Sequence, residues 1–131
     1  MLKQDQFEQG VRRVGAEQEM VFVDKAFRPA LIGPQIKASL DKKYITTEYV
    51  RFNLEVNLSP ISFQSDCLSK LKSELIEKIA EVEQQAKKHK AEIPLTGILP
   101  TIRKSDTAPE VMTQEPRYLM RTATTTILFI P

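Results

Sequence analysis

The clearest alternation of apolar and polar positions in the chain runs over residues 51–58. One parity is apolar and the other polar: Phe52, Leu54, Val56 and Leu58 against Arg51, Asn53, Glu55 and Asn57. A period of two predicts a β-strand with one face packed on a core and the other turned toward water. The Ser-Pro pair at 59–60 indicates where this strand ends.

Residues 66–88 repeat apolar positions at the spacing of a helix. The apolar residues recur three and four positions apart: Leu68, Leu71, Leu75, Ile79, Val82 and Ala86. This spacing predicts an amphipathic helix about 35 Å long with one apolar stripe. Ser65 or Asp66 is placed to cap its first turn. Because only one stripe is apolar, we expect the helix to lie across a sheet with its charged face in water.

Weaker patterns fill the remainder of the chain. β-Branched and aromatic residues predict a strand over 11–23, a short return strand over 30–32 and a further strand over 93–99. Residues 103–118 contain Pro109 and Pro116 and predict an extended loop with at most a short helix. We therefore expect an α+β fold in a single domain over residues 1–131, with an antiparallel sheet that carries the long amphipathic helix on one face.

Length and composition narrow the classes of function. The 131 residues are 41% hydrophobic, enough for one core, and the net charge of +2 indicates neither nucleic acid nor a membrane surface as a partner. One cysteine, Cys67, and one histidine exclude an intrachain disulfide and the usual Cys/His zinc sites. No apolar run reaches the roughly 18 residues of a membrane span. We expect a cytoplasmic protein whose chemistry rests on carboxylates.

Glu17 and Glu19 are the first candidate pair. They lie two positions apart on a predicted strand, so both side chains project from one face with Cα atoms roughly 6.7 Å apart. Carboxylates at that spacing suit a hard divalent ion such as Mg²⁺ or Mn²⁺, which commonly binds ATP phosphates as well. Taken alone, the pair is more typical of two ordinary surface acids on a solvated strand.

Glu55 and Glu48 extend the pair. Glu55 lies on the polar face of the 51–58 strand, between Asn53 and Asn57. Glu48 precedes it by seven residues and has the opposite parity on a continuous strand. For both carboxylates to point into one site, the chain must turn or bulge between residues 45 and 51.

Four short segments together resemble the glutamate–cysteine ligase family of carboxylate–amine ligases. They are Gly-Ala-Glu-Gln-Glu at 15–19, Tyr-Ile-Thr-Thr-Glu-Tyr at 44–49, Asn-Leu-Glu at 53–55 followed by Pro60, and Gly-Ile-Leu-Pro-Thr at 97–101. Their order and the spacing from Glu48 to Glu55 carry the resemblance, which covers residues 11–120. It implies a fold similar to glutamine synthetase, of which this chain would be the N-terminal part.

The resemblance also implies a reaction, in which ATP phosphorylates a substrate carboxylate and an amine attacks the acyl phosphate to form an amide. Glutamate and an amine such as cysteine would be the substrates, as in glutathione biosynthesis. The family's acidic metal ligands match Glu17, Glu19, Glu48 and Glu55, which would hold Mg²⁺ or Mn²⁺ against the phosphates of ATP. Arg117 matches a position suited to binding a substrate carboxylate or phosphate, although it can equally be a surface arginine. No further catalytic side chain is implied.

The end of the chain departs from the family. Residues 121–131 change abruptly to a threonine run followed by four apolar residues, and family members run to several hundred residues. We therefore expect a partial ligase domain that is inactive as this 131-residue chain. The alternative is a non-catalytic remnant of the fold that binds a divalent ion or a partner.

Overall fold

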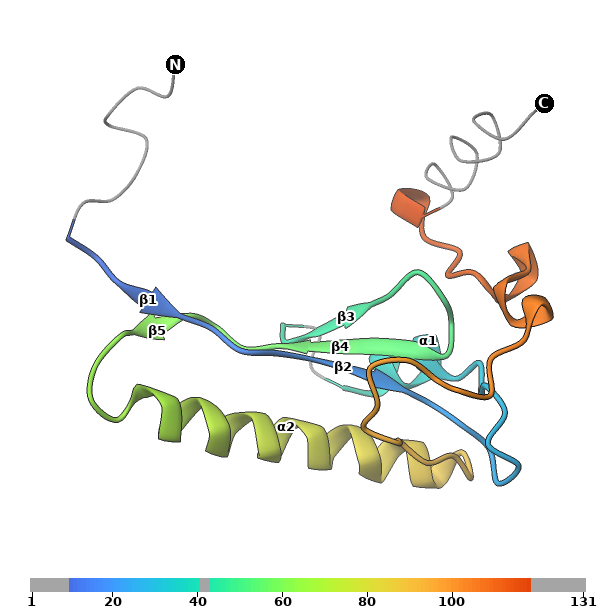
Figure 1. Ribbon diagram of the computed structural model, residues 1–131, viewed down its shortest axis with the longest axis horizontal. Helices are drawn as coiled ribbons and strands as arrows, with labels where there is room; N and C mark the ends of the chain where they lie inside the picture. The colour runs from blue at the N-terminus through green and yellow to red at the C-terminus, as the bar shows by residue number, and fades with distance from the viewer. Residues whose placement is uncertain (1–9, 41–42, 119–131) are drawn as a thin grey trace, which may run out of the picture.

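A computed structural model describes residues 10–40 and 43–118 and has an α+β architecture. Its centre is a three-stranded antiparallel sheet in the order β2-β4-β3, and a two-stranded ribbon pairs β1 with β5 (Figure 1). The strands are β1 (Arg13–Val14), β2 (Glu17–Val21), β3 (Ile45–Thr47), β4 (Asn53–Asn57) and β5 (Ile61–Ser62). The expected antiparallel sheet is thus confirmed.

The alternation over residues 51–58 correctly predicts the central strand. Leu54 and Val56 of β4 are fully buried, and the Asn53, Glu55 and Asn57 side chains on the opposite face are half-buried. The buried face packs into a hydrophobic core together with Met20 of β2. A central strand that alternates in this way leaves one face of the sheet free for polar side chains.

The long helix is also where the spacing predicts it. Helix α2 (Cys67–Lys88) lies along one side of the sheet, and its Leu71, Val82 and Ala86 enter the core (Figure 1). Leu68 is the exception, because it is 63% exposed while its neighbour Cys67 is buried. The first turn of the helix therefore buries Cys67 rather than Leu68.

The start of α2 differs from the predicted cap. Asp66 occupies the position before the first turn, but its side chain makes no capping hydrogen bond. Its carboxylate instead pairs with Lys70 Nζ at 2.8 Å, and that hydrogen bond lowers the pKa of Asp66.

A short helix forms where the sequence makes no prediction. Helix α1 (Gly33–Ser39) begins with Pro34 in its first turn, a position at which proline's missing N–H costs nothing. Gly33 is required there because a Cβ atom would lie 2.7 Å from the carbonyl oxygen of Arg51. Ile36 buries itself in the same core as β4, so α1 and α2 contact each other beneath the sheet.

Three predicted strands need correction. Residues 11–23 form two strands rather than one, because β1 leaves the sheet at Gly15 and pairs with β5. The return strand over 30–32 is reduced to a bridge between Val23 and Pro29. The predicted strand over 93–99 does not form, since only Glu92 pairs with Val23 before the chain turns away at Pro94.

The segment after residue 103 has the irregular structure that its prolines predict. It contains two single-turn 3-10 helices, η2 (Lys104–Thr107) and η3 (Pro109–Val111), and folds back against the end of the sheet (Figure 1). The predicted tail over residues 121–131 lies outside the described residues. Within the described ranges, no helix has the length and apolar character needed to cross a membrane.

Candidate functional site

Three of the predicted acids lie on the face of the sheet opposite the core. Two belong to β2 and one to β4, and the pairing of these strands places them side by side. The register of this pairing sets Glu19 directly opposite Glu55 and Glu17 opposite Asn57. Cβ atoms of residues directly opposite each other lie about 4.5–5.5 Å apart in antiparallel strands. Glu17 and Glu19 are exposed and Glu55 is half-buried. We call this surface, formed by Glu17, Glu19 and Glu55, the carboxylate face.

Glu48 joins the carboxylate face from the turn after β3. The chain reverses between Thr47 and Asn53, as the opposite parity of Glu48 and Glu55 requires. Burial raises the pKa of the Glu48 carboxyl, and the negative charges of Glu55 and Glu19 raise it further. A hydrogen bond with Glu55 acts in the same direction, whereas one from the Tyr49 backbone lowers the pKa. Glu19, Glu48 and Glu55 therefore interact electrostatically as one acidic cluster.

The turn that carries Glu48 is held by the C-terminal segment. The Thr113 hydroxyl donates to the carbonyl oxygen of Glu48 at 2.5 Å, and the Thr113 amide donates to that of Tyr49 at 3.0 Å. The buried Tyr118 hydroxyl donates to the carbonyl oxygen of Thr47. No local pattern in the sequence indicates this support, because the partners lie 64 to 71 residues apart.

Two asparagines beside Glu55 complete the face. The Asn57 side-chain amide donates to Glu55 Oε2 at 3.0 Å and to Thr46 Oγ1 at 3.1 Å, which fixes one carboxylate oxygen. Asn53 Oδ1 is buried and accepts no hydrogen bond from the described residues. Both residues share the parity of Glu55, as the alternation over residues 51–58 predicts.

Arg117 is engaged by the chain itself. Its guanidinium donates to the carbonyl oxygen of Thr47 at 2.7 Å and stacks over the Tyr118 ring at 4.4 Å. Its Nε atom lies 3.4 Å from Glu115 Oε2. Arg117 thus contacts the backbone just before the turn that carries Glu48. Its predicted role in binding substrate stays a prediction.

The donors suit a hard cation, but they are not gathered around one point. Carboxylate oxygens are the ligands that Mg²⁺ and Mn²⁺ prefer. Among residues 10–40 and 43–118, no group of three or more His, Cys, Asp or Glu side chains is placed to hold a metal ion. None of the ion pairs between described residues neutralises Glu17, Glu19, Glu48 or Glu55. Within residues 10–40 and 43–118, the negative charge of the cluster therefore has no ion-pair partner.

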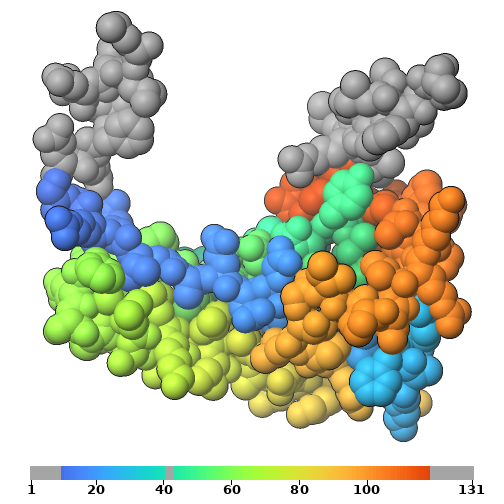
Figure 2. Space-filling model, viewed as in Figure 1, coloured from blue at the N-terminus to red at the C-terminus, as the bar shows by residue number. Residues whose placement is uncertain are grey.

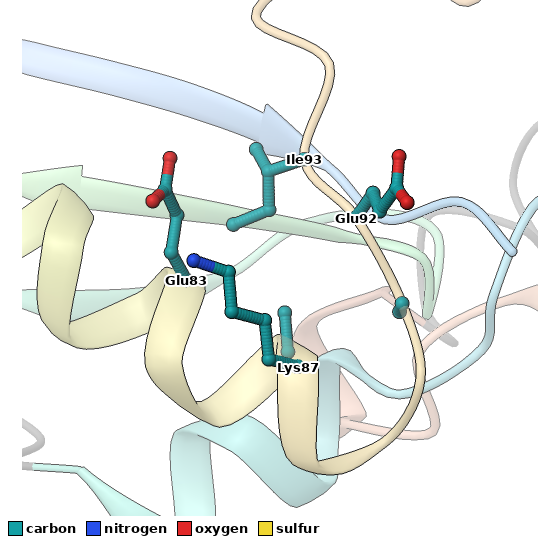
Figure 3. A pocket seen from close by; sticks show the side chains of 6 residues that line it. Glu83, Lys87, Glu92 and Ile93 are labelled. Carbon is teal, nitrogen blue, oxygen red and sulfur yellow. The ribbon is translucent and has the colours of Figure 1, made fainter. Parts of the chain in front are cut away.

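A pocket lies at the C-terminal end of α2, away from the carboxylate face. This pocket of about 260 Å³ is lined by Glu83, Ala86, Lys87, Ala91, Glu92 and Ile93 (Figure 3). Lys87 points toward Glu83, while the chain beyond Ile93 turns away from the end of β2 (Figure 3). Its charges are of both signs, so it lacks the like-charged groups that distinguish the carboxylate face.

Comparison of the chain with protein-family models, with curated proteins and with solved structures finds no match.

Proposed function

We propose that this chain is the N-terminal part of an ATP-dependent carboxylate–amine ligase of the glutamate–cysteine ligase type, with a glutamine-synthetase-like fold. The observation that carries the proposal is the convergence of Glu19, Glu48 and Glu55, three acids from separate segments, on one face of the sheet. Each belongs to one of the short motifs that resemble this family. Uncompensated like charges on an open face favour binding of a cation.

The carboxylates would hold Mg²⁺ or Mn²⁺ together with the phosphates of ATP. Glu17, Glu19, Glu48 and Glu55 are the proposed ligands, and Asn57 orients one oxygen of Glu55. Mg²⁺ usually keeps several waters and takes only one or two protein carboxylates, so ligands need not form a closed cage. The bound ion would supply charge neutralisation for phosphoryl transfer.

In the proposed reaction, a substrate carboxylate oxygen attacks the γ-phosphorus of ATP, and the bond to the bridging oxygen breaks with release of ADP. The amine of the second substrate then attacks the acyl carbon, an amide forms, and inorganic phosphate leaves with the oxygen that it received. Glutamate and cysteine are the proposed substrates. Arg117 would bind a substrate carboxylate through N–H groups of its guanidinium other than those that donate to Thr47.

The second candidate is binding without catalysis. It is favoured by the observation that no three acidic side chains of the described ranges are placed around one point. In this case the carboxylate face would bind a divalent ion or a positively charged partner, and nucleotide would play no part.

One titration separates the two candidates. We would measure the thermal midpoint with Mn²⁺ alone, with ATP alone, and with both, because a ligand that binds only the native state raises it; at 100 times Kd the stabilisation is about 2.7 kcal/mol. The ligase proposal expects a larger shift with Mn²⁺ and ATP together than the sum of the separate shifts. An Mn²⁺ shift that ATP does not increase supports non-catalytic binding of a divalent ion. The absence of any shift contradicts the ligase proposal and leaves binding of a positively charged partner as the second candidate.

A further inference from the structure

The outer edge of β2 presents backbone groups that no described strand pairs. The Phe22 amide donates to the carbonyl oxygen of Phe52, which leads into β4. The backbone N–H and C=O groups of alternate β2 residues therefore point toward β4, and those of the residues between them point away from it. The residues whose backbone groups point away are Glu17, Glu19 and Val21. The sheet order places β2 at an edge (Figure 1).

The chain itself begins to cover this edge and then stops. Val23 and Glu92 exchange both backbone hydrogen bonds, at 3.0 and 2.9 Å. Continuing that pairing would set Pro94 opposite Val21, and proline has no N–H to donate. Figure 3 shows the chain leaving the end of β2 at Ile93. Among the described residues, the outward backbone groups of Glu17 and Glu19 therefore have no strand partner, apart from the carbonyl of Glu19, which accepts from the Gln18 side chain at 2.7 Å. Val21 is only 7% exposed and packs beside Leu99, so the accessible edge ends before it.

The charge beside this edge selects what can pair with it. A strand added next to β2 places alternate side chains beside Glu17 and Glu19, on the carboxylate face. A second copy pairing through the same edge in antiparallel register would bring these acids against their own equivalents, which is unfavourable. Lysine or arginine at alternate positions would instead complement them.

We propose that the β2 edge binds an extended peptide segment in which basic residues alternate with apolar ones. Backbone hydrogen bonds to Glu17 and Glu19 add the segment to the sheet. Its basic side chains contact Glu17 and Glu19, while its apolar side chains lie on the opposite face of the extended sheet. The Gln18 amide turns outward to release the carbonyl of Glu19. This edge binding goes beyond the proposed ligase reaction and does not require it.

The test uses the full chain in metal-free buffer and a short blocked peptide in which lysine alternates with valine. Peptide affinity is measured by fluorescence anisotropy, and amide hydrogen exchange is followed residue by residue. Exchange at Glu17 and Glu19 should slow on binding, whereas Gln18 and Met20, which already bond to β4, serve as internal controls. Unchanged exchange at the two outward amides overturns the proposal.

A charge-reversal variant tests the selectivity. Replacing both acids, Glu17→Lys with Glu19→Lys, should weaken binding of the lysine peptide at least five-fold and create binding of its glutamate counterpart. The matched control reverses two exposed acids elsewhere, Glu74→Lys with Glu110→Lys, and should preserve the lysine preference. Equal effects of the two variants contradict a specific edge site. Slowed exchange at Glu19 that depends on protein concentration without peptide shows self-pairing instead and also contradicts the proposal.

Discussion

Glu55 is the residue at which stability and proposed function oppose each other. It faces Glu19 across the strand pair and lies close enough to Glu48 to raise the pKa of that carboxyl. Like charges directly opposite each other destabilise a sheet. Destabilising clusters of like charge are common at functional sites, and a cation bound between the carboxylates would remove the repulsion.

Replacing Glu55 with glutamine should therefore stabilise the fold and remove its response to metal. Glu55→Gln keeps the shape and the acceptor for Asn57, and relief of the repulsion should raise the free energy of unfolding by roughly 0.2–1 kcal/mol. Urea unfolding with and without Mn²⁺ measures both effects. The control Glu74→Gln, on the exposed face of α2, should change stability by no more than about 0.5 kcal/mol. A destabilised Glu55→Gln protein would contradict the repulsion at Glu55, and a variant that keeps its full Mn²⁺ response would contradict cation binding by this carboxylate.

Glu48 gives a pH dependence of defined sign. Folding raises the pKa of Glu48. The contribution of this carboxyl to the free energy of unfolding is therefore most favourable below the ordinary glutamate pKa, and it is lost as pH rises through the raised value. We expect Glu48→Gln to match the wild type in acid and to be more stable near neutral pH. Thermal midpoints from pH 4 to pH 8 would show the difference growing with pH. A variant that is less stable at neutral pH would contradict this assignment.

At the scale of elements, the core between α2 and β4 is what presents the carboxylate face outward. Leu54 and Val56 pack against the side chains of α2, and this packing turns Glu55 to the opposite side. A shift of β4 by one residue would exchange the two faces. The register of β4 is therefore secured by burial rather than by the acids themselves.

Two leucines at the start of α2 test this packing. Leu71→Ala removes a side chain that is 4% exposed and should cost about 2–5 kcal/mol, whereas Leu68→Ala removes one that is 63% exposed. We expect the second change to stay within about 0.5 kcal/mol. Chemical unfolding measures the loss of stability in both variants, which differ in burial but share the same Leu→Ala substitution. Equal losses would show that the helix presents a different face to the sheet.

The elements that the sequence predicts correctly are those whose periodicity is long and regular. Strand β4 and helix α2 bury one parity or one stripe, so burial and local pattern agree. The strand predicted over 93–99 fails because Pro94 cannot continue the ladder that Glu92 starts. Helix α1 has too few residues for a visible period, and its start depends on the close approach of Gly33 to Arg51.

For the candidate site, the sequence predicts the acids but not what positions them. The parity of Glu17, Glu19 and Glu55 follows from the strand pattern, and the turn that Glu48 needs is present. The supports from Thr113 and Tyr118 come from a segment with no regular pattern. Such long-range backbone contacts leave no local trace in the sequence.

At the scale of the whole molecule, the described chain forms a curved body with the carboxylate face between two raised ends. Figure 2 shows β1 rising at one end and the C-terminal segment, coloured orange to red, at the other. That segment is attached partly through Glu115, which accepts from Thr47 Oγ1 at 2.7 Å and from Lys37 Nζ at 3.1 Å. The attachment links α1, β3 and the segment that supports Glu48.

Loss of the Glu115 carboxylate should loosen this end. The hydrogen bond from Thr47 lowers the pKa of Glu115, and Lys37 lowers it further, so the stabilisation is present above the ordinary glutamate pKa and is lost as pH falls through the lowered value. Glu115→Gln should cost about 1 kcal/mol or less near neutral pH, because the site is partly exposed, and should match the wild type in acid. Thermal midpoints across pH test this, and a pH-independent loss would contradict it.

The central claim is that a divalent cation binds among Glu19, Glu48 and Glu55. Paramagnetic broadening by substoichiometric Mn²⁺ tests it most directly, since amide signals weaken according to their distance from the bound ion. If the cation binds there, the amide signals of Glu19 and Glu55 lose intensity first, and Glu55→Gln abolishes the broadening. Broadening centred on Glu77 and Glu81 of α2, or spread evenly over the chain, would contradict the claim.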